Sequence, residues 1–190
     1  MNDDQVYPLH PLLKMAIDHF QFEAIHPFRD GNGRTGRVFN IHYLVKKGLL
    51  DYSILYLSRY IVEHKEAYYG ALAGVSQRGD WTTWLRYMLK AVEVTAHLTF
   101  GKISRIVAAR DAVLAEVQQH KEFRRPDQLV QKIFTQPITR IRHLTGDRTY
   151  AINTARAYLD GLAELQVLEK QTIQGQYYYL NRELYTILAD

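Results

Sequence analysis

The first half of the chain carries apolar residues at the spacing of amphipathic helices. Residues 11–25 present apolar side chains every three to four positions and predict one helix. A second helix is expected over residues 36–47, closed by Gly48. Ser58 is a suitable N-cap for a third, which would run to about Leu72. This pattern predicts a mainly α-helical fold.

A glycine-rich turn over residues 74–79 separates that third helix from a longer one. Asp80 would cap the longer helix, whose pattern continues to about Gln119. Gly101 lies within it and either kinks the helix or divides it in two. The first part of the chain is therefore expected to be all-helical.

The pattern changes at residues 121–126, where a basic stretch ending in proline indicates a linker. We therefore predict a helical domain over residues 1–120 and a smaller domain over residues 121–190. The smaller domain should hold three helices and a β-hairpin, namely a helix from Asp127 to Phe134, one beginning at Pro137, one capped by Thr149 or Asn153 and running through Leu165, and strands at 167–170 and 177–180 joined at Gln174-Gly175. Three helices followed by a hairpin resemble a winged helix-turn-helix.

Composition narrows the class of protein. The 190 residues are 47% hydrophobic, which is enough to bury a core, and the formal net charge is only +4. The chain has no cysteine, which excludes disulfides, thiolate metal sites and cysteine nucleophiles. It shows no secretory signal and no apolar stretch of membrane-spanning length, so a cytoplasmic protein is expected.

The chemically richest segment is residues 26–37, His-Pro-Phe-Arg-Asp-Gly-Asn-Gly-Arg-Thr-Gly-Arg. Gly31 and Gly33 can adopt backbone angles closed to other residues, so their N–H groups can turn inward and form an anion-binding nest. The segment leads into a helix N-terminus, whose free N–H groups and dipole favour phosphate. Arg34 and Arg37 lie three residues apart on that first turn and can hold one ligand together.

The other side chains of this segment suggest further parts of a polyphosphate site. Pro27 favours an extended His26 at the end of the preceding helix, where the imidazole can accept a proton from a hydroxyl nucleophile. Asp30 is the only carboxylate in the segment, and Mg²⁺ in nucleotide sites takes one or two carboxylates. Asn32 can donate its amide to a phosphoryl oxygen, and Phe28 is expected to pack beneath the loop.

Residues 26–37 fill every defining position of the pattern His-Pro-Phe-x-Asp-Gly-Asn-Gly-Arg-x-x-Arg, and the chain therefore resembles the Fic (filamentation-induced-by-cAMP) family. The segments at 20–25, 58–61 and 81–85 extend the resemblance over about the first two-thirds of the chain. The resemblance implies a Fic-type helical core. It also implies a protein adenylyltransferase, which moves AMP from ATP to a Ser, Thr or Tyr hydroxyl of a target protein and releases pyrophosphate.

The resemblance further implies a role for individual residues. His26 would be the catalytic base, and Asp30 would hold Mg²⁺. ATP would contact the loop and a wall on the helix that begins at Ser58, through Phe28, Arg29, Gly31, Asn32, Gly33, Arg34, Arg37, Glu63, His64 and Tyr68. The family commonly carries an asparagine where Glu63-His64 stand, which leaves the base preference open. For Tyr68, packing between helices is the alternative interpretation.

Two elements that family members commonly carry have no counterpart in this sequence: an inhibitory Ser/Thr-x-x-x-Glu-Gly/Asn helix and a β-hairpin flap ahead of the motif. The resemblance therefore indicates a Fic protein shortened at its N-terminus, with Arg37 free of the inhibitory glutamate. A Fic-type transferase of another group, such as UMP or phosphocholine, is an alternative. Gly33 argues against the phosphate-transferring branch, which resembles this motif with a lysine at that position.

The C-terminal domain raises a third possibility, a DNA-binding transcriptional regulator. The expected recognition helix carries Arg148 and Arg156 but also Asp160 and Glu164, whereas a helix that tracks phosphates presents a clearer basic stripe. A protein-contact role, including a homodimer, is therefore favoured over DNA binding.

Overall fold

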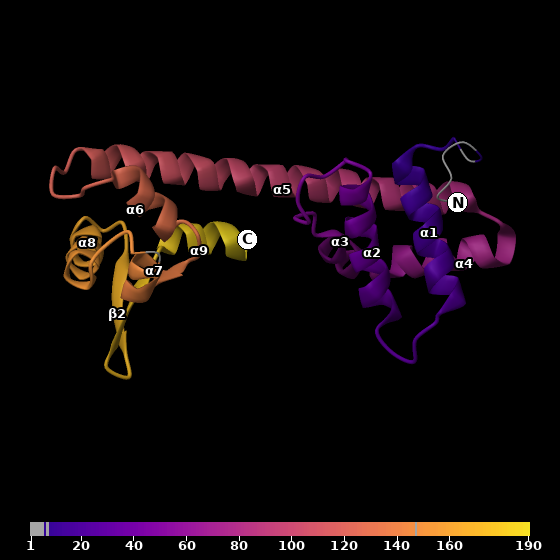
Figure 1. Cartoon of the computed structure of the whole chain (residues 1–190). Coiled ribbons are helices and arrows are strands. Elements are labelled where there is room, and N and C mark those ends of the chain that lie inside the picture. The colour runs from indigo at the N-terminus through magenta and orange to yellow at the C-terminus, as the bar shows by residue number, and fades with distance from the viewer. Residues whose placement is uncertain (1–5, 7, 147) are drawn as a thin grey trace. The chain divides into compact units, whose positions relative to one another are not determined.

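The computed structural model describes residue 6, residues 8–146 and residues 148–190. The fold is mainly helical with one small sheet, which confirms the expected fold class (Figure 1). It divides into two compact units, residues 1–100 and residues 101–190. This division falls inside a long helix, whereas the domain boundary expected from sequence falls in the loop after it. Each unit has its own core.

The first unit is built of five helical segments: α1 (Pro11–Ile25), α2 (Asn32–Lys46), α3 (Leu57–Glu63), α4 (Lys65–Arg78) and the first part of α5 (Trp81–Gln118). Helix α1 has the bounds that the sequence predicts. His10 caps it by accepting a hydrogen bond from the Leu12 amide at 3.2 Å, and Pro11 occupies the first turn. Helix α5 is one element from residue 81 to 118, so Gly101 does not divide it.

The predicted start of α2 is wrong by four residues. The helix begins at Asn32, directly after Gly31, which has the left-handed φ of 86°. The Gly31 carbonyl already accepts the Thr35 amide at 2.9 Å. Glycine adopts this conformation without the steric cost that a Cβ would add, so the chain turns into the helix one full turn earlier than its apolar pattern begins.

The expected single helix from Ser58 to Leu72 is also wrong. The structure has two helices, α3 and α4, which meet at His64, a residue with φ −120° and ψ 40°. Tyr56 is the N-cap of α3, and Ser58 lies inside its first turn. Helix α4 continues through the expected turn to Arg78, because Gly74 is helical and only Gly79 is left-handed.

The core of the first unit surrounds Trp84 of α5, which is fully buried. Its indole N–H donates a 2.8 Å hydrogen bond to the carbonyl of Ala16 in α1. This bond joins residues 68 positions apart and satisfies a polar group that would be costly to bury alone. Asp80 caps α5 as predicted, since the Thr83 amide donates to its carboxylate at 3.1 Å.

The second unit contains the rest of α5 followed by α6 (Pro126–Ile133), β1 (Ile138–Thr139), α7 (Ile141–Thr145), α8 (Ile152–Glu164), β2 (Glu169–Ile173), β3 (Gln176–Leu180) and α9 (Arg182–Ala189). The strands form an antiparallel sheet in the order β1-β3-β2. The expected hairpin is confirmed. Gln174 and Gly175 both have positive φ, the geometry of a tight two-residue turn.

Three sequence-based expectations for this unit are wrong. The helix expected from Pro137 begins only at Ile141, because Ile138 and Thr139 pair with β3 instead. Ala151 is the N-cap of α8, so neither Thr149 nor Asn153 caps it. Helix α9 was not predicted at all; Asn181 caps it by accepting the Leu184 amide at 3.0 Å.

The helices α6, α7 and α8 with the β2–β3 hairpin have the composition of a winged helix-turn-helix (Figure 1). Their core gathers apolar side chains from α6, α7, α8 and β3, among them Tyr179 and Leu159, both fully buried. Among the described residues, no helix is long and apolar enough to cross a membrane.

Candidate active site

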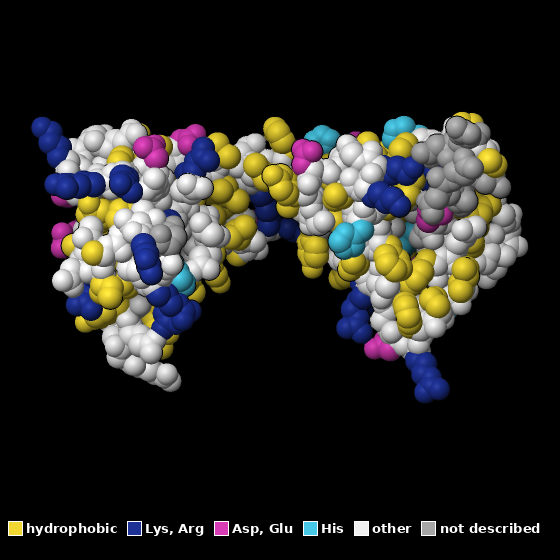
Figure 2. Space-filling model, viewed as in Figure 1, with side chains coloured by type: hydrophobic (Ala, Val, Ile, Leu, Met, Phe, Trp, Pro, Cys, Tyr) yellow, Lys and Arg dark blue, Asp and Glu magenta, His cyan; other side chains and the backbone are white. Residues whose placement is uncertain are grey.

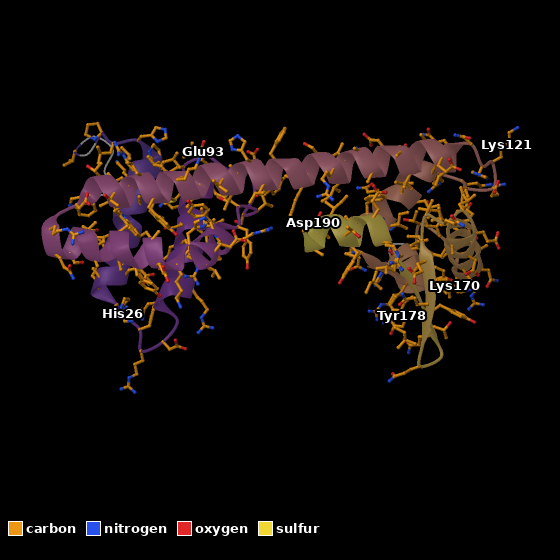
Figure 3. All side chains as sticks on the ribbon, turned by 180° about the vertical axis from the view of Figure 1, so that it is seen from behind. His26, Glu93, Lys121, Lys170, Tyr178 and Asp190 are labelled. Carbon is orange, nitrogen blue, oxygen red and sulfur yellow. The ribbon has the colours of Figure 1, made fainter. Side chains whose placement is uncertain are left out.

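His26 ends α1 and opens the loop of the first unit, where Figure 3 labels it. Its side chain is exposed, and its backbone is left-handed, with φ 51° and ψ 56°. The expected extended conformation is therefore wrong. The following proline disfavours the right-handed helical region, and the left-handed alternative lets the His26 amide donate to the Phe22 carbonyl at 3.0 Å. A non-glycine residue in this region is strained, which is common at functional sites.

The carboxamide of Asn32 closes the loop. Its Nδ2 donates to the Phe28 carbonyl at 2.6 Å, and its Oδ1 accepts the Phe28 amide at 2.9 Å. The side chain is 3% exposed, so these bonds form a buried clamp on the loop backbone. The structure thus gives Asn32 a part in shaping the loop, and its expected donation to a phosphoryl oxygen stays a prediction.

Asp30 and Arg34 lie at the outer surface of the loop. The guanidinium of Arg34 donates to Asp30 Oδ2 at 3.1 Å, and the side chains are 74% and 92% exposed for Arg34 and Asp30 respectively. Asp30 Oδ1 also accepts the Gly31 amide at 2.7 Å. An exposed ion pair of this kind contributes at most about 1 kcal/mol to stability. Breaking it so that either side chain can bind a ligand therefore costs little.

Arg37 is oriented differently from Arg34, although the two share one helical turn. Its Nε donates to the Ser58 hydroxyl of α3 at 3.0 Å. Its Nη1 reaches back over the loop, because a Cβ built on Gly33 would lie 3.1 Å from it. Gly33 itself is helical, so the expected unusual backbone angles apply to Gly31 alone. Gly33 is small for a different reason: it leaves room for the Arg37 side chain.

Beneath the loop, α1 and α2 approach each other closely at Gly36. A Cβ there would lie 2.8 Å from Glu23 Oε1 and 3.0 Å from His19 Cε1, so no side chain fits. His19 is 2% exposed, and burial lowers its pKa to about 4. The sequence analysis singled out neither His19 nor Glu23. Their spacing of four residues on α1 was the available signal, since it places both on the face toward α2.

The residues expected to form an adenine wall do not share one helix. The ring of His64 stacks on that of Tyr60, with centroids 4.1 Å apart, at the break between α3 and α4. Glu63 is exposed and pairs with Arg59 at 2.9 Å. Tyr68 is only 4% exposed and points into the core, which is the packing role left open for it.

The surface around the loop is apolar. Ile25, Phe28, Val38 and Phe39 are each about half exposed or more, and Figure 2 shows hydrophobic side chains gathered over this part of α1 and α2. The Phe28 ring is tilted by 53° to that of Phe22, with the two centroids 6.2 Å apart. No cluster of three or more His, Asp or Glu side chains able to hold a metal occurs among the described residues. Any metal in this loop would therefore need oxygen ligands from a substrate as well.

Comparison with protein families agrees with this geometry. The model of the Fic/DOC family matches residues 2–44, which include α1 and most of α2. Residues 110–184 match the model described as the C-terminal domain of SoFic-like protein adenylyltransferases. The chain is therefore similar to the Fic/DOC family over residues 2–44. The first match contains the Fic loop (residues 26–37), and the second covers most of the winged-helix-like unit.

Individual Fic relatives are similar over part of the chain. A protein adenylyltransferase Fic from Culex quinquefasciatus is 32% identical over 106 residues, which cover 56% of this chain and 20% of that protein. A probable protein adenylyltransferase from Aquifex aeolicus is 44% identical over 64 residues, covering 34% of this chain and 20% of that protein. The chain thus spans about a fifth of the length of these curated relatives. A Fic family protein from Desulfovibrio desulfuricans G20 aligns in structure with 25% identity and a TM-score of 0.46, covering 92% of this chain and 50% of that chain.

Proposed function

We propose that this chain acts as a protein adenylyltransferase, with His26 as the catalytic base. The observation that carries the proposal is the Fic loop itself. It places an exposed imidazole at the end of α1 within one loop of two arginines and a helix N-terminus. Such a loop can bind a polyphosphate and accept a proton beside it. The curated relatives, which are protein adenylyltransferases, support the same activity.

In the proposed reaction, a hydroxyl of the target protein attacks the α-phosphorus of ATP. The oxygen–phosphorus bond to the β-phosphate breaks, pyrophosphate leaves, and the hydroxyl proton passes to His26. Arg34 and Arg37, with the first N–H groups of α2, would bind the phosphates. The exposed apolar side chains beside the loop offer a surface for the target polypeptide.

Asp30 fits a magnesium ion. The side chain of Asp30 is 92% exposed and that of its partner Arg34 is 74% exposed, so Asp30 can reach a cation that arrives with a nucleotide. One carboxylate together with phosphate oxygens and water is the usual set of ligands for Mg²⁺ in such sites. Bound there, the ion would neutralise charge on the phosphates.

Transfer of UMP or phosphocholine is the second candidate, because the loop recognises phosphates and the base wall departs from the family pattern. The stacked pair of Tyr60 and His64 offers a flat aromatic surface, to which either a purine or a pyrimidine could bind. We favour AMP because the named relatives are adenylyltransferases.

For the second unit we propose a protein-contact role rather than DNA binding. On α8, Asp160 pairs with Lys170 of the hairpin at 2.7 Å, which neutralises one cation near the wing. Ile152 at the start of α8 is 62% exposed and Ile173 at the wing is 51% exposed, as suits a contact with protein. A duplex-binding protein would be retained by random-sequence DNA at low salt and released as salt rises. We expect no such retention.

Mass spectrometry tests the transfer activity. The chain is incubated with Mg²⁺ and, in separate samples, ATP, UTP or CDP-choline, and the mass added to the chain or to a supplied target identifies the transferred group. We expect an adenylyl adduct with ATP. His26→Ala should abolish the adduct but retain ATP affinity, because the phosphates are bound by other residues; loss of a general base typically costs about 10²–10⁴-fold in rate. A uridylyl or phosphocholine adduct would establish the second candidate, and equal adduct formation by His26→Ala would remove this histidine from the mechanism.

A further inference from the structure

Glu23 of α1 is a half-buried glutamate that the proposed chemistry does not use. It lies three residues before His26, and its Oε1 is buried without a hydrogen-bond partner among the described residues. A carboxylate oxygen without a donor is unfavourable in the interior, and each such group in a native structure calls for an explanation. Glu23 therefore needs a role that compensates for its cost.

The neighbours of this carboxylate belong to the Fic loop. Its Oε1 would lie 2.8 Å from a Cβ on Gly36 and 3.8 Å from one on Gly33, so it sits against the first turn of α2. Burial raises the pKa of Glu23, whereas the positive charges of Arg37 and then His26 lower it. The carboxylate is thus placed beside Arg37 and His26, the two groups to which the proposed reaction assigns work.

Arg37 lies against the same glycine, Gly33. Its Nη1 lies 3.1 Å from the Cβ position of Gly33, while its Nε is bound to Ser58 at 3.0 Å. A guanidinium is planar and rigid, so an anchor at Nε and an opposite charge near the other end fix the direction of the remaining N–H groups. Ser58 supplies the first of these two constraints, and Glu23 lies where the second would act.

A carboxylate at this place also has an electrostatic disadvantage. It lies next to a site for a polyphosphate, which a negative charge repels. The Tyr68 hydroxyl lies 3.0 Å from His19 Nε2, and burial and then the charge of Glu23 raise the pKa of Tyr68 above its ordinary value. Glu23 is therefore useful only if what it does for Arg37 exceeds its repulsion of the ligand.

We propose that Glu23 is a positioning residue, which holds the Arg37 guanidinium toward the phosphate-binding loop from the side opposite Ser58. The proposal rests on the proposed function only in taking Arg37 as a phosphate ligand. It makes a prediction of definite sign. If Glu23 positions Arg37, its removal weakens ATP binding. If it is a bystander charge, its removal strengthens ATP binding, because a repulsive charge has gone.

The test is Glu23→Gln, which keeps the size of the side chain and removes its charge. Affinities for ATP and AMP are measured by calorimetry in the presence of Mg²⁺, and folding is checked by tryptophan fluorescence, since both tryptophans lie in the first unit. We expect ATP affinity to fall by about tenfold, which corresponds to about 1.4 kcal/mol, and AMP affinity to stay the same. An ATP affinity equal to or above that of the wild type would overturn the proposal.

A second variant and a matched control make the result independent of folding problems. Glu23→Met, an apolar residue of similar length, should show the same loss of ATP affinity. Asp18→Asn changes another partly buried carboxylate on α1, whose pKa burial also raises, but one that lacks Arg37 as a neighbour. It should bind ATP as the wild type does, and a loss as large as that of Glu23→Gln would overturn the assignment to Arg37.

A double-mutant cycle separates positioning from general damage. In an Arg37→Ala background, Glu23→Gln should not weaken ATP binding further, because the group that it positions is gone and only its repulsion of the ligand remains. Additive losses would show that Glu23 acts elsewhere and would overturn the proposal. Failure of the wild type to bind ATP would instead contradict the proposed function, so the two ideas fail by different results.

Discussion

His19 Nε2 lies 3.0 Å from the hydroxyl of Tyr68, across 49 positions of sequence and inside the core of the first unit. The imidazole also stacks on the indole of Trp84, with centroids 6.0 Å apart and planes within 6°. This contact joins α1 to α4 and α5 directly beneath the Fic loop. The stability of the loop therefore depends on a histidine that must stay neutral.

The first prediction is a loss of stability at low pH that His19 causes. Burial lowers its pKa to about 4, below the ordinary 6.5. Between these values the unfolded chain binds a proton that the folded chain does not, so the free energy of unfolding falls as pH falls from about 6.5 to about 4. A shift of this size corresponds to about 3 kcal/mol over the whole window.

Urea unfolding followed by tryptophan fluorescence at pH 7 and pH 4.5 measures this loss. Asp18 and Glu23 act in the opposite sense, because burial raises the pKa of both. The comparison is therefore between the wild type and His19→Gln, which lacks the titrating group. A pH dependence that is the same in both proteins would show that His19 does not cause it.

The second prediction concerns the close approach at Gly36. Gly36→Ala should destabilise the first unit by about 1–3 kcal/mol, because the new methyl group would overlap Glu23 and His19. Gly70→Ala in α4 is the matched control. Nothing lies within 4 Å of that Cβ position, so alanine should stabilise the helix by up to about 1 kcal/mol. We expect the denaturant midpoint to fall in Gly36→Ala and to rise in Gly70→Ala, relative to the wild type. An unchanged midpoint in Gly36→Ala would mean that α1 and α2 separate easily.

The third prediction concerns Asp30. Asp30→Asn should lower the transfer rate by about 100-fold and weaken its dependence on Mg²⁺, because a carboxylate is a far better magnesium ligand than an amide. Initial rates are measured against Mg²⁺ concentration at saturating ATP. Asp51→Asn, an exposed carboxylate outside the Fic loop, is the control. An unchanged Mg²⁺ titration in Asp30→Asn would place the metal elsewhere.

The fourth prediction concerns the second unit. The Tyr179 hydroxyl donates to Asp160 Oδ1 at 2.7 Å, and the ring is fully buried. Tyr179→Phe should destabilise this unit by about 1–3 kcal/mol, since it removes a hydrogen bond to a charged acceptor. Tyr177→Phe, which changes a ring that is 43% exposed, should stay within about 0.5 kcal/mol of the wild type. Hydrogen exchange of the β3 amides measures both; equal protection in all three proteins would contradict the prediction.

Local features of the fold could be read from the sequence. Helix α1 has the predicted bounds because a proline starts it and its apolar spacing is regular. The hairpin forms at Gln174-Gly175 because this pair accepts positive φ at both positions. The sequence also predicts a phosphate-binding loop over residues 26–37, since glycines, arginines and a histidine stand at fixed spacing within one short segment, and this stays a prediction.

The tertiary structure decided what joins distant segments. Ile138 and Thr139 are a strand only because Leu180 and Tyr179 stand opposite them, and nothing in their own neighbourhood favours that state over a helix. Ser58 was expected to cap a helix, but it binds Arg37 across 21 residues. A side chain has few possible partners close to it in sequence and many that are distant in sequence. Sequence spacing therefore restricts only the contacts between nearby residues. The role proposed for Glu23 can be inferred only from the packing of α1 against α2.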